Sequence, residues 1–124
     1  MPANSRVLLL ESDRQIIDQL RDAFEERGME TEVALSGEVA LGIMAERMMQ
    51  IILVSWAFTE EPPYDLVKNV SLANPKARIM VYGAAKTKAH QKKMLRSGAR
   101  DVIQEPVEVA QILKAVEDGI ESGE

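Results

Sequence analysis

Three short stretches carry side chains that can do chemistry. The stretch "IILVSWAFTE" ends an apolar run at Ser55, "ESD" offers Glu11 and Asp13, and "QEP" offers Glu105. A serine acts as a nucleophile only when a neighbouring base removes its proton. Carboxylates grouped in space supply the oxygen ligands that Mg²⁺ and Ca²⁺ prefer. The elements that position these four side chains therefore decide which chemistry is open to them.

Composition excludes several kinds of site. The chain of 124 residues has no cysteine and a single histidine, His90. Disulfides, thiolate metal centres, a cysteine nucleophile and a histidine-rich metal centre are thereby excluded. His90 falls on a charged helical pattern, where we expect it to be solvated. The formal net charge of -5 disfavours nonspecific binding to nucleic acid or to anionic lipid.

The hydropathy pattern indicates one globular domain. Hydrophobic residues make up 46% and charged residues 28% of the chain, as in ordinary globular proteins. No apolar run approaches the ~18 residues that a membrane helix needs. The first apolar run is also too short for a signal peptide. We expect a single cytoplasmic domain over residues 1–124, with an ordered core of about 5–121.

Apolar runs of strand length alternate with helical patterns along the whole chain. Helices are predicted after each strand, the first capped by Ser12 or Asp13 and ended by Gly28. The second helix begins at Ser36, and the fourth is capped by Thr87 and ended by Gly98. The second helix is expected to bury Val39, Ala40, Ile43 and Met44. Strands are predicted at 6–10, 31–35, 50–55, 78–82 and 100–104.

This alternation predicts an α/β fold of the (βα)5 type. Nearly continuous apolar strands indicate a parallel sheet covered by helices on both faces. We predict a flavodoxin-like, doubly wound, five-stranded parallel sheet in three layers, α/β/α. Sites in such folds lie at the carboxyl ends of the strands. Those ends are Glu11, Ser12 and Asp13; Ser55 and Trp56; Gly83 and Ala84; and Glu105 and Pro106.

The whole chain resembles the receiver domain of bacterial response regulators. The resemblance rests on the order and spacing of "RVLLLESD", "ALSGEVAL", "NPKARIMVYGA" and "SGARDVIQEPVEVAQILKAV". In that family, an acidic pair after the first strand binds magnesium, and an aspartate that ends the third strand accepts a phosphoryl group. A threonine or serine that ends the fourth strand senses the phosphoryl group. A lysine before a proline at the end of the fifth strand contacts it.

The resemblance implies a degenerate phosphorylation site. By position, the acidic pair falls on Glu11 and Ser12, the acceptor on Ser55, the switch hydroxyl on Gly83 and the lysine on Glu105. Only Glu11 keeps the family's type of residue. Aspartyl phosphorylation needs a carboxylate nucleophile, a divalent cation and a positive charge near the phosphoryl oxygens. We therefore expect a pseudo-receiver that lacks the phosphoacceptor aspartate and works without phosphorylation.

Two other uses of this edge stay open. Catalysis by Ser55 would need Glu11 or Glu105 as its base, and a carboxylate matches an alkoxide poorly, so we expect no enzyme activity. A divalent cation such as magnesium would take Glu11 and Asp13 as its candidate ligands, with Glu105 beside them. The carbonyl of Ala57 would assist, since it matches the family's backbone ligand. No cofactor is expected.

If no metal binds, we expect Ser12 and Asp13 to cap the first helix while Glu11 remains solvated. The family's aromatic switch position, in the fifth strand, falls on Val102.

Larger side chains around the site have two interpretations each. Trp56 either projects as a recognition residue or is covered by the loop that contains two prolines after it. Together with Phe58, it is the first candidate for a binding role outside the phosphorylation-site positions. Met44, Met48 and Met49 are expected to pack in the core rather than to form a soft binding surface.

Charge is distributed unevenly in the last third of the chain. Residues 86–100 hold six of the fifteen basic residues: Lys86, Lys88, Lys92, Lys93, Arg96 and Arg100. Beyond them lie one lysine, Lys114, and seven acids: Asp101, Glu105, Glu108, Glu117, Asp118, Glu121 and Glu124.

In the receiver family, the fourth helix, fifth strand and fifth helix form the usual surface for partners and symmetric dimers. A basic helix beside an acidic strand and helix is self-complementary about a two-fold axis. We predict an interaction face, and a possible homodimer, from Lys88, Lys92, Lys93, Arg96, Asp101, Glu108 and Glu117. The alternative is two solvated faces, because surface ion pairs contribute only ~0–1 kcal/mol each.

The expected function is a phosphorylation-independent protein-interaction module of two-component signal transduction. It is expected to act as a stand-alone adaptor or as the amino-terminal part of a larger regulator. The alternative is a sensor of a metal or small ligand that uses the acidic pocket. Nucleic-acid binding through the basic helix is disfavoured by the net acidity and by the absence of interleaved aromatic residues.

Overall fold

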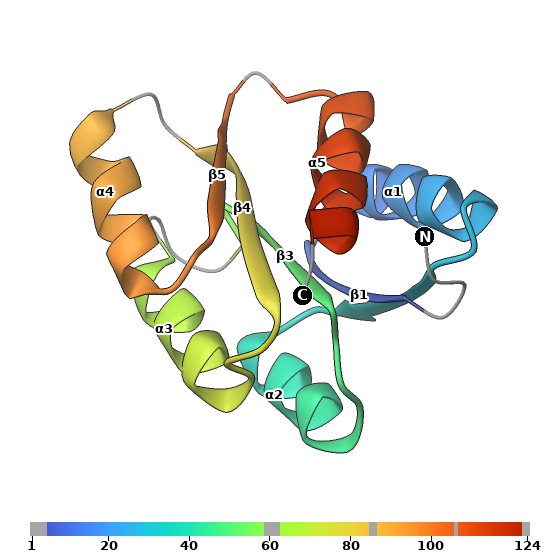
Figure 1. Cartoon of the computed structure of the whole chain (residues 1–124), viewed down its shortest axis with the longest axis horizontal. Helices are drawn as coiled ribbons and strands as arrows, with labels where there is room; N and C mark the ends of the chain where they lie inside the picture. The colour runs from blue at the N-terminus through green and yellow to red at the C-terminus, as the bar shows by residue number, and fades with distance from the viewer. Residues whose placement is uncertain (1–4, 59–62, 85–86, 106, 123–124) are drawn as a thin grey trace.

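The computed structural model describes residues 5–58, 63–84, 87–105 and 107–122, drawn in colour in Figure 1. These residues form alternating strands and helices. The strands are β1 (Arg6–Leu10), β2 (Glu30–Ala34), β3 (Ile51–Ser55), β4 (Arg78–Ala84) and β5 (Asp101–Gln104). The helices are α1 (Arg14–Glu26), α2 (Gly37–Glu46), α3 (Tyr64–Ala73), α4 (Lys88–Ser97) and α5 (Val109–Ser122). Within these described residues, no helix combines the length and apolar character that crossing a membrane requires.

The strands form one parallel sheet in the order β2-β1-β3-β4-β5. This order and the five helices confirm the predicted flavodoxin-like fold. The predicted strand 6–10 matches β1, the strands predicted at 31–35, 50–55 and 100–104 differ from the observed ones by one residue at their ends, and β4 continues two residues further than predicted, to Ala84. The direction of strand addition reverses between β1 and β3, so the carboxyl ends of these two strands border the crevice where such folds place their sites.

Helices cover both faces of the sheet and bury two separate cores. Helices α1 and α5 lie on one face, and α2, α3 and α4 lie on the other (Figure 1). The first core is built around Phe24, Leu9 and Leu53, and the second around Leu8, Leu10 and Val54. Because β1 and β3 supply alternate residues to the two cores, their apolar side chains are buried on both faces.

The helix ends follow the predicted signals. Asp13 caps α1, since its Oδ1 accepts hydrogen bonds from the backbone N–H groups of Gln15 (3.0 Å) and Ile16 (3.3 Å). The Ser36 hydroxyl likewise caps α2 through the N–H of Val39 (3.1 Å). Thr87 occupies the cap position of α4 without a side-chain hydrogen bond.

Two predicted core positions are wrong. Val39 is 49% exposed and Met48 is 62% exposed. Val39 lies on the outer side of α2, and only Ala40 and Met44 are buried among that helix's residues. Met48 follows the end of α2, where the helical repeat no longer applies, whereas Met49 packs under β3 as predicted.

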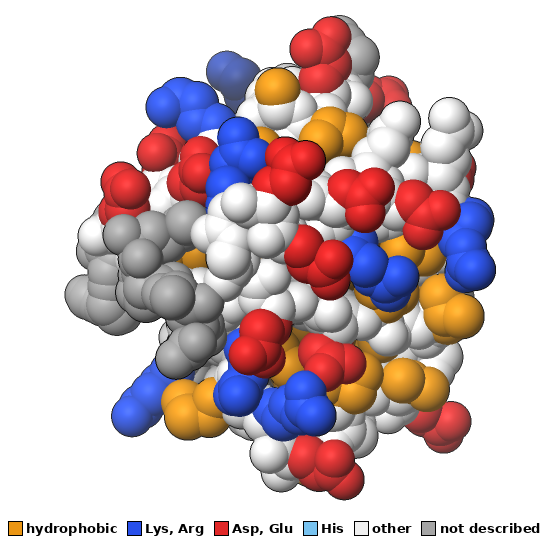
Figure 2. Space-filling view, turned by 90° about the vertical axis from the view of Figure 1, so that its right-hand side faces the viewer, with side chains coloured by type: hydrophobic (Ala, Val, Ile, Leu, Met, Phe, Trp, Pro, Cys, Tyr) orange, Lys and Arg blue, Asp and Glu red, His pale blue; other side chains and the backbone are white. Residues whose placement is uncertain are grey.

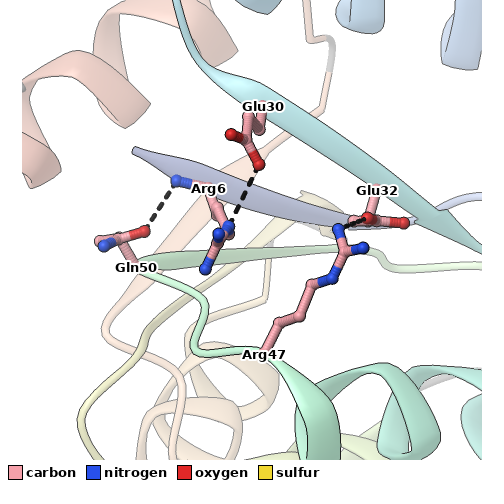
Figure 3. Close-up of polar contacts among 5 residues, drawn as sticks. All are labelled: Arg6, Glu30, Glu32, Arg47 and Gln50. Atoms are coloured by element: carbon pink, nitrogen blue, oxygen red, sulfur yellow. Dashed lines mark hydrogen bonds and ion pairs between the residues drawn. The ribbon is translucent and has the colours of Figure 1, made fainter. Parts of the chain in front are cut away.

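Ion pairs tie the edge strand β2 to its neighbours (Figure 3). Arg6 Nε lies 3.1 Å from Glu30 Oε1, and Arg47 pairs with Glu32. The amide of Gln50 accepts a hydrogen bond from the backbone N–H of Arg6 at 2.7 Å. Charged side chains along an edge strand oppose pairing with a strand of another molecule.

Seen from the right-hand side of Figure 1, acidic and basic side chains are mixed over the surface (Figure 2).

Candidate functional site

The carboxyl ends of β1, β3, β4 and β5 border a hollow of about 520 Å³. Its lining combines oxygen-bearing groups with an apolar wall from α1 and α5. The polar members include the predicted Glu11, Ser12, Asp13, Ser55 and Glu105. The sheet thus brings together the positions that the sequence had assigned to the degenerate phosphorylation site, Gly83 included.

Glu11 is buried, and the expectation that it remains solvated is wrong. Glu11 directly follows β1 and is only 5% exposed. One carboxylate oxygen accepts hydrogen bonds from the backbone N–H groups of Ser12 and Asp13, both at 3.0 Å. The other accepts a hydrogen bond from the hydroxyl of Tyr82. Three donors thereby compensate the cost of burying this carboxylate.

Tyr82 is the functional residue that sequence reasoning missed. It lies directly opposite Ser55 in the β3–β4 register, and its buried hydroxyl donates to Glu11. The side chain of Ser55 interacts with the same hydroxyl. Burial, and then the hydrogen bond to Glu11, raise the pKa of Tyr82 above its usual value against a smaller lowering effect of Ser55, so the phenol stays protonated and remains a donor.

Gly83 contributes backbone geometry to this edge. Its φ of 78° is in the left-handed region, and the β4–β5 register shifts between Tyr82 and Ala84. A glycine accommodates such a bulge without steric cost. The side chain that reaches the hollow from the end of β4 is therefore that of Tyr82, one position earlier. The signal in the sequence was available, because Tyr82 ends the predicted strand 78–82 and is its only residue with a hydroxyl.

Ser55 has no activating base beside it. Its half-buried side chain contacts Tyr82, and none of the described residues that line the hollow is a lysine, arginine or histidine. The nearby Glu11 is already engaged by three donors. This arrangement can hold a hydroxyl in place, but it offers no route to a serine alkoxide.

The carboxylates present do not fit the magnesium site of the receiver family. Glu11 accepts from Tyr82 and two backbone amides, and Asp13 Oδ1 is used as the cap of α1. Within the described parts of the chain, no three acidic or histidine side chains are grouped closely enough to hold a metal ion. Hard divalent cations need several free oxygen ligands, and this edge offers few.

Trp56 and Phe58 pack inward, so neither projects as a recognition residue. They are 6% and 8% exposed. The Trp56 ring meets Tyr64 edge to face, with centroids 6.4 Å apart, and lies 6.1 Å from the ring of His90 on α4. Lys93 Nζ sits 4.5 Å above the centre of the Tyr64 ring. The loop containing Pro62 lies outside the described residues. His90 is exposed, as expected, and the aromatic contacts join the end of β3 to α4.

The charged residues of the predicted interaction face divide into two groups. Lys88, Lys92 and Arg96 are exposed on α4, and the structure pairs none of these three with an acid among the described residues. By contrast, two acids of the face have partners within the chain. Asp101 pairs with Arg78 (Oδ2 to Nε, 2.8 Å) and Glu117 with Arg27, the residue that follows α1 (Oε2 to Nε, 2.9 Å). Glu108 is exposed, and Lys86 lies outside the described residues.

A parallel 2-1-3-4-5 sheet with an acidic hollow at the carboxyl ends of β1 and β3 places the chain in the class of flavodoxin-like domains, which includes receiver domains. The pattern of the response regulator receiver domain family matches residues 7–117. The chain therefore belongs to this family, whose members are signalling modules.

The individual proteins that this chain resembles include a regulatory protein and a response regulator. The photosynthetic apparatus regulatory protein RegA of Rhodobacter capsulatus is 27% identical over 113 residues, covering 89% of this chain and 60% of that protein. The chain thus spans about three fifths of the length of that relative. A two-component response regulator from Clostridium difficile superposes with a TM-score of 0.85 at 17% identity, covering 95% and 97% of the two chains. A structure described as one of a family of streptococcal redox sensors that evolved from two-component response regulators gives 0.79 at 18% identity, covering 94% and 51%.

Proposed function

We propose that this receiver domain is a protein-interaction module that works without phosphorylation. The observation that carries the proposal is the group of side chains at the strand ends. Ser55 takes the acceptor position, and the remaining carboxylate, Glu11, is held by Tyr82 and two backbone amides. A carboxylate nucleophile is missing, and the acid that would help to hold magnesium is engaged within the protein.

Glu105 adds an electrostatic barrier. It is exposed at the hollow, in the place of the family's lysine. Two unit charges about 4 Å apart interact by roughly 4 kcal/mol at an effective dielectric constant of 20. A carboxylate here repels a phosphoryl group that a lysine would attract. The comparison with redox sensors that evolved from response regulators supports the idea that this fold serves tasks other than phosphotransfer.

The face formed by α4, β5 and α5 is the proposed interaction surface. Helix α4 and helix α5 flank the edge strand β5 (Figure 1). Exposed Lys88, Lys92 and Arg96 lie on one side of β5, and the exposed Glu108 lies on the other. Under a two-fold axis these charges meet charges of opposite sign. A second copy of the chain is therefore the proposed partner of this face, alongside other signalling proteins.

We expect self-association that does not respond to a phosphodonor. Light scattering at about 100 µM protein should show a dimer of the same population with and without acetyl phosphate and Mg²⁺. Because the contact is charged, 0.5 M salt or Lys92→Glu should shift the mass toward the monomer. The matched control is Lys68→Glu, a charge reversal at an exposed lysine of α3, outside the proposed face. A monomer under all conditions, or a dimer only with the phosphodonor, would contradict the proposal.

A small-ligand sensor is the second candidate, and the size and mixed polar and apolar lining of the hollow support it. The metal version of this candidate has no support from the carboxylates present. A thermal-shift screen of small organic cations would test the ligand version. A ligand of the hollow should raise the melting temperature of the wild type but not that of Glu105→Gln. If no cation does so, the ligand version is contradicted.

A further inference from the structure

Polar contacts among the protein's own side chains line the site where a phosphoryl group would bind in a working receiver. The Ser55 side chain contacts the Tyr82 hydroxyl, which donates to Glu11, which in turn accepts from the N–H groups of Ser12 and Asp13. Each of these contacts joins a different element. The ends of β3, β4 and β1 and the start of α1 are therefore connected by side chains that belong to the protein itself.

A backbone hydrogen bond also holds Tyr82, in addition to the contact of its hydroxyl with Glu11. The N–H of Trp56 donates to the carbonyl oxygen of Tyr82 at 2.9 Å. The Trp56 ring is in turn packed against Tyr64 at the start of α3 and against His90 on α4. Tyr82 is thus linked through Trp56 to the helix that carries the basic half of the proposed interaction face.

The energetic balance favours keeping this tyrosine in place. Glu11 is 5% exposed, so loss of the phenol would leave a buried carboxylate oxygen without a protein donor. An unsatisfied buried polar group is costly, more so when it is charged. The β4–β5 register shifts directly after Tyr82, between Tyr82 and Ala84, so the regular ladder is interrupted beside this tyrosine.

We propose that the phenol of Tyr82, held by Glu11 at the wall of the emptied acceptor site, is a latch that keeps the end of β4, Trp56 and α4 in one conformation. This inference rests on the proposed function, because the latch keeps α4 in one conformation without a phosphoryl group. The domain presents its α4 face constitutively. Breaking the latch loosens α4 without unfolding the two cores.

The test is Tyr82→Phe, which removes the hydroxyl and keeps the ring. Amide hydrogen exchange in β4 and α4 should accelerate by about tenfold or more, while exchange in β1 and α1 residues buried in the cores changes little. Trp56 is the only tryptophan, so its fluorescence reports the same event. Its emission should shift to the red, and acrylamide should quench it more strongly.

The chain offers a matched control in Tyr64→Phe. The Tyr64 hydroxyl is buried and has no hydrogen-bond partner among the described residues, although its ring touches Trp56. Removing it should leave exchange and fluorescence close to wild type. Ser55→Ala, which removes the hydroxyl that interacts with Tyr82, should accelerate exchange in β4 and α4 by a smaller factor of about threefold. This milder variant also keeps the test decisive if Tyr82→Phe fails to fold.

Unchanged exchange in folded Tyr82→Phe would overturn the latch. Equal acceleration in Tyr64→Phe and Tyr82→Phe would overturn it too, because the effect would then come from the aromatic packing. All these measurements are made without a phosphodonor. If the exchange and fluorescence results contradict the latch, the proposed function can still hold, because the domain can remain unphosphorylated. If the wild type becomes phosphorylated, the proposed function is contradicted, but the exchange and fluorescence results are unchanged.

Discussion

Ser55→Asp alone is expected to leave the domain unlabelled by acetyl phosphate. The new carboxylate would face Glu105 across the hollow and lie beside the Tyr82–Glu11 contact. A variant that also carries Ser12→Asp, Tyr82→Thr and Glu105→Lys is expected to accept a phosphoryl group in a magnesium-dependent way. The four substitutions supply the nucleophile, a second acid for the metal, an open pocket and a cation.

The size of this effect comes chiefly from Glu105. Exchanging a negative for a positive charge about 4 Å from a phosphoryl oxygen changes the interaction by several kcal/mol at intermediate dielectric, or more than a thousandfold in occupancy. Labelling should therefore fall to the background when Glu105 is left unchanged in the fourfold variant. Intact-mass spectrometry measures the labelled fraction directly.

A control separates this local effect from net charge. Glu108 is exposed and does not line the hollow. In the fourfold variant, Glu108→Lys in place of Glu105→Lys alters the net charge equally, and we expect it to leave labelling at background. Labelling of Ser55→Asp alone would show that Glu105 and Tyr82 are no barrier to phosphorylation.

Gly98→Ala is expected to lower the free energy of unfolding by about 2 to 4 kcal/mol. Gly98 ends α4 with a φ of 127°, which side chains rarely adopt. A Cβ there would also lie 2.6 Å from Cβ of Ser71 on α3. Both the backbone strain and the contact with α3 act in the folded state, so the urea midpoint should fall while the slope of the transition stays the same.

Gly42→Ala on α2 is the matched control. A Cβ at Gly42 would meet nothing within 4 Å, and the residue lies inside a helix. Alanine is the better helix former there, so we expect a gain of about 0.5 to 1 kcal/mol. Equal effects of the two substitutions would show that the α3–α4 contact at Gly98 is not close.

The fold could be predicted from the sequence because its signals are local and repeated. The run "RVLLL" is buried on both faces as β1, and Asp13 and Gly98 mark helix ends as expected. Val39 was misplaced because α2 is apolar nearly all round, so the helical repeat does not single out one face. The exposure of such a residue depends on the tertiary packing of α2 against α3 and the sheet.

The site was predicted in its location but only partly in its contacts. The strand-end rule brings Glu11, Ser55 and Glu105 to one hollow. The partner of Glu11 depends on the β3–β4 register, which places Tyr82 opposite Ser55 and which neither strand reveals by itself. Burial of Glu11 is a consequence of that contact. The pairing of Glu117 with Arg27 likewise depends on how α1 and α5 sit side by side on the sheet.

The central claim is that the wild-type domain does not take up a phosphoryl group. The most direct measurement is intact-mass spectrometry of the wild-type chain after incubation with acetyl phosphate and Mg²⁺. With Ser55 at the acceptor position and Glu11 held by Tyr82, the mass should remain that of the unmodified chain. A gain of one phosphoryl group that is lost in Ser55→Ala would contradict it.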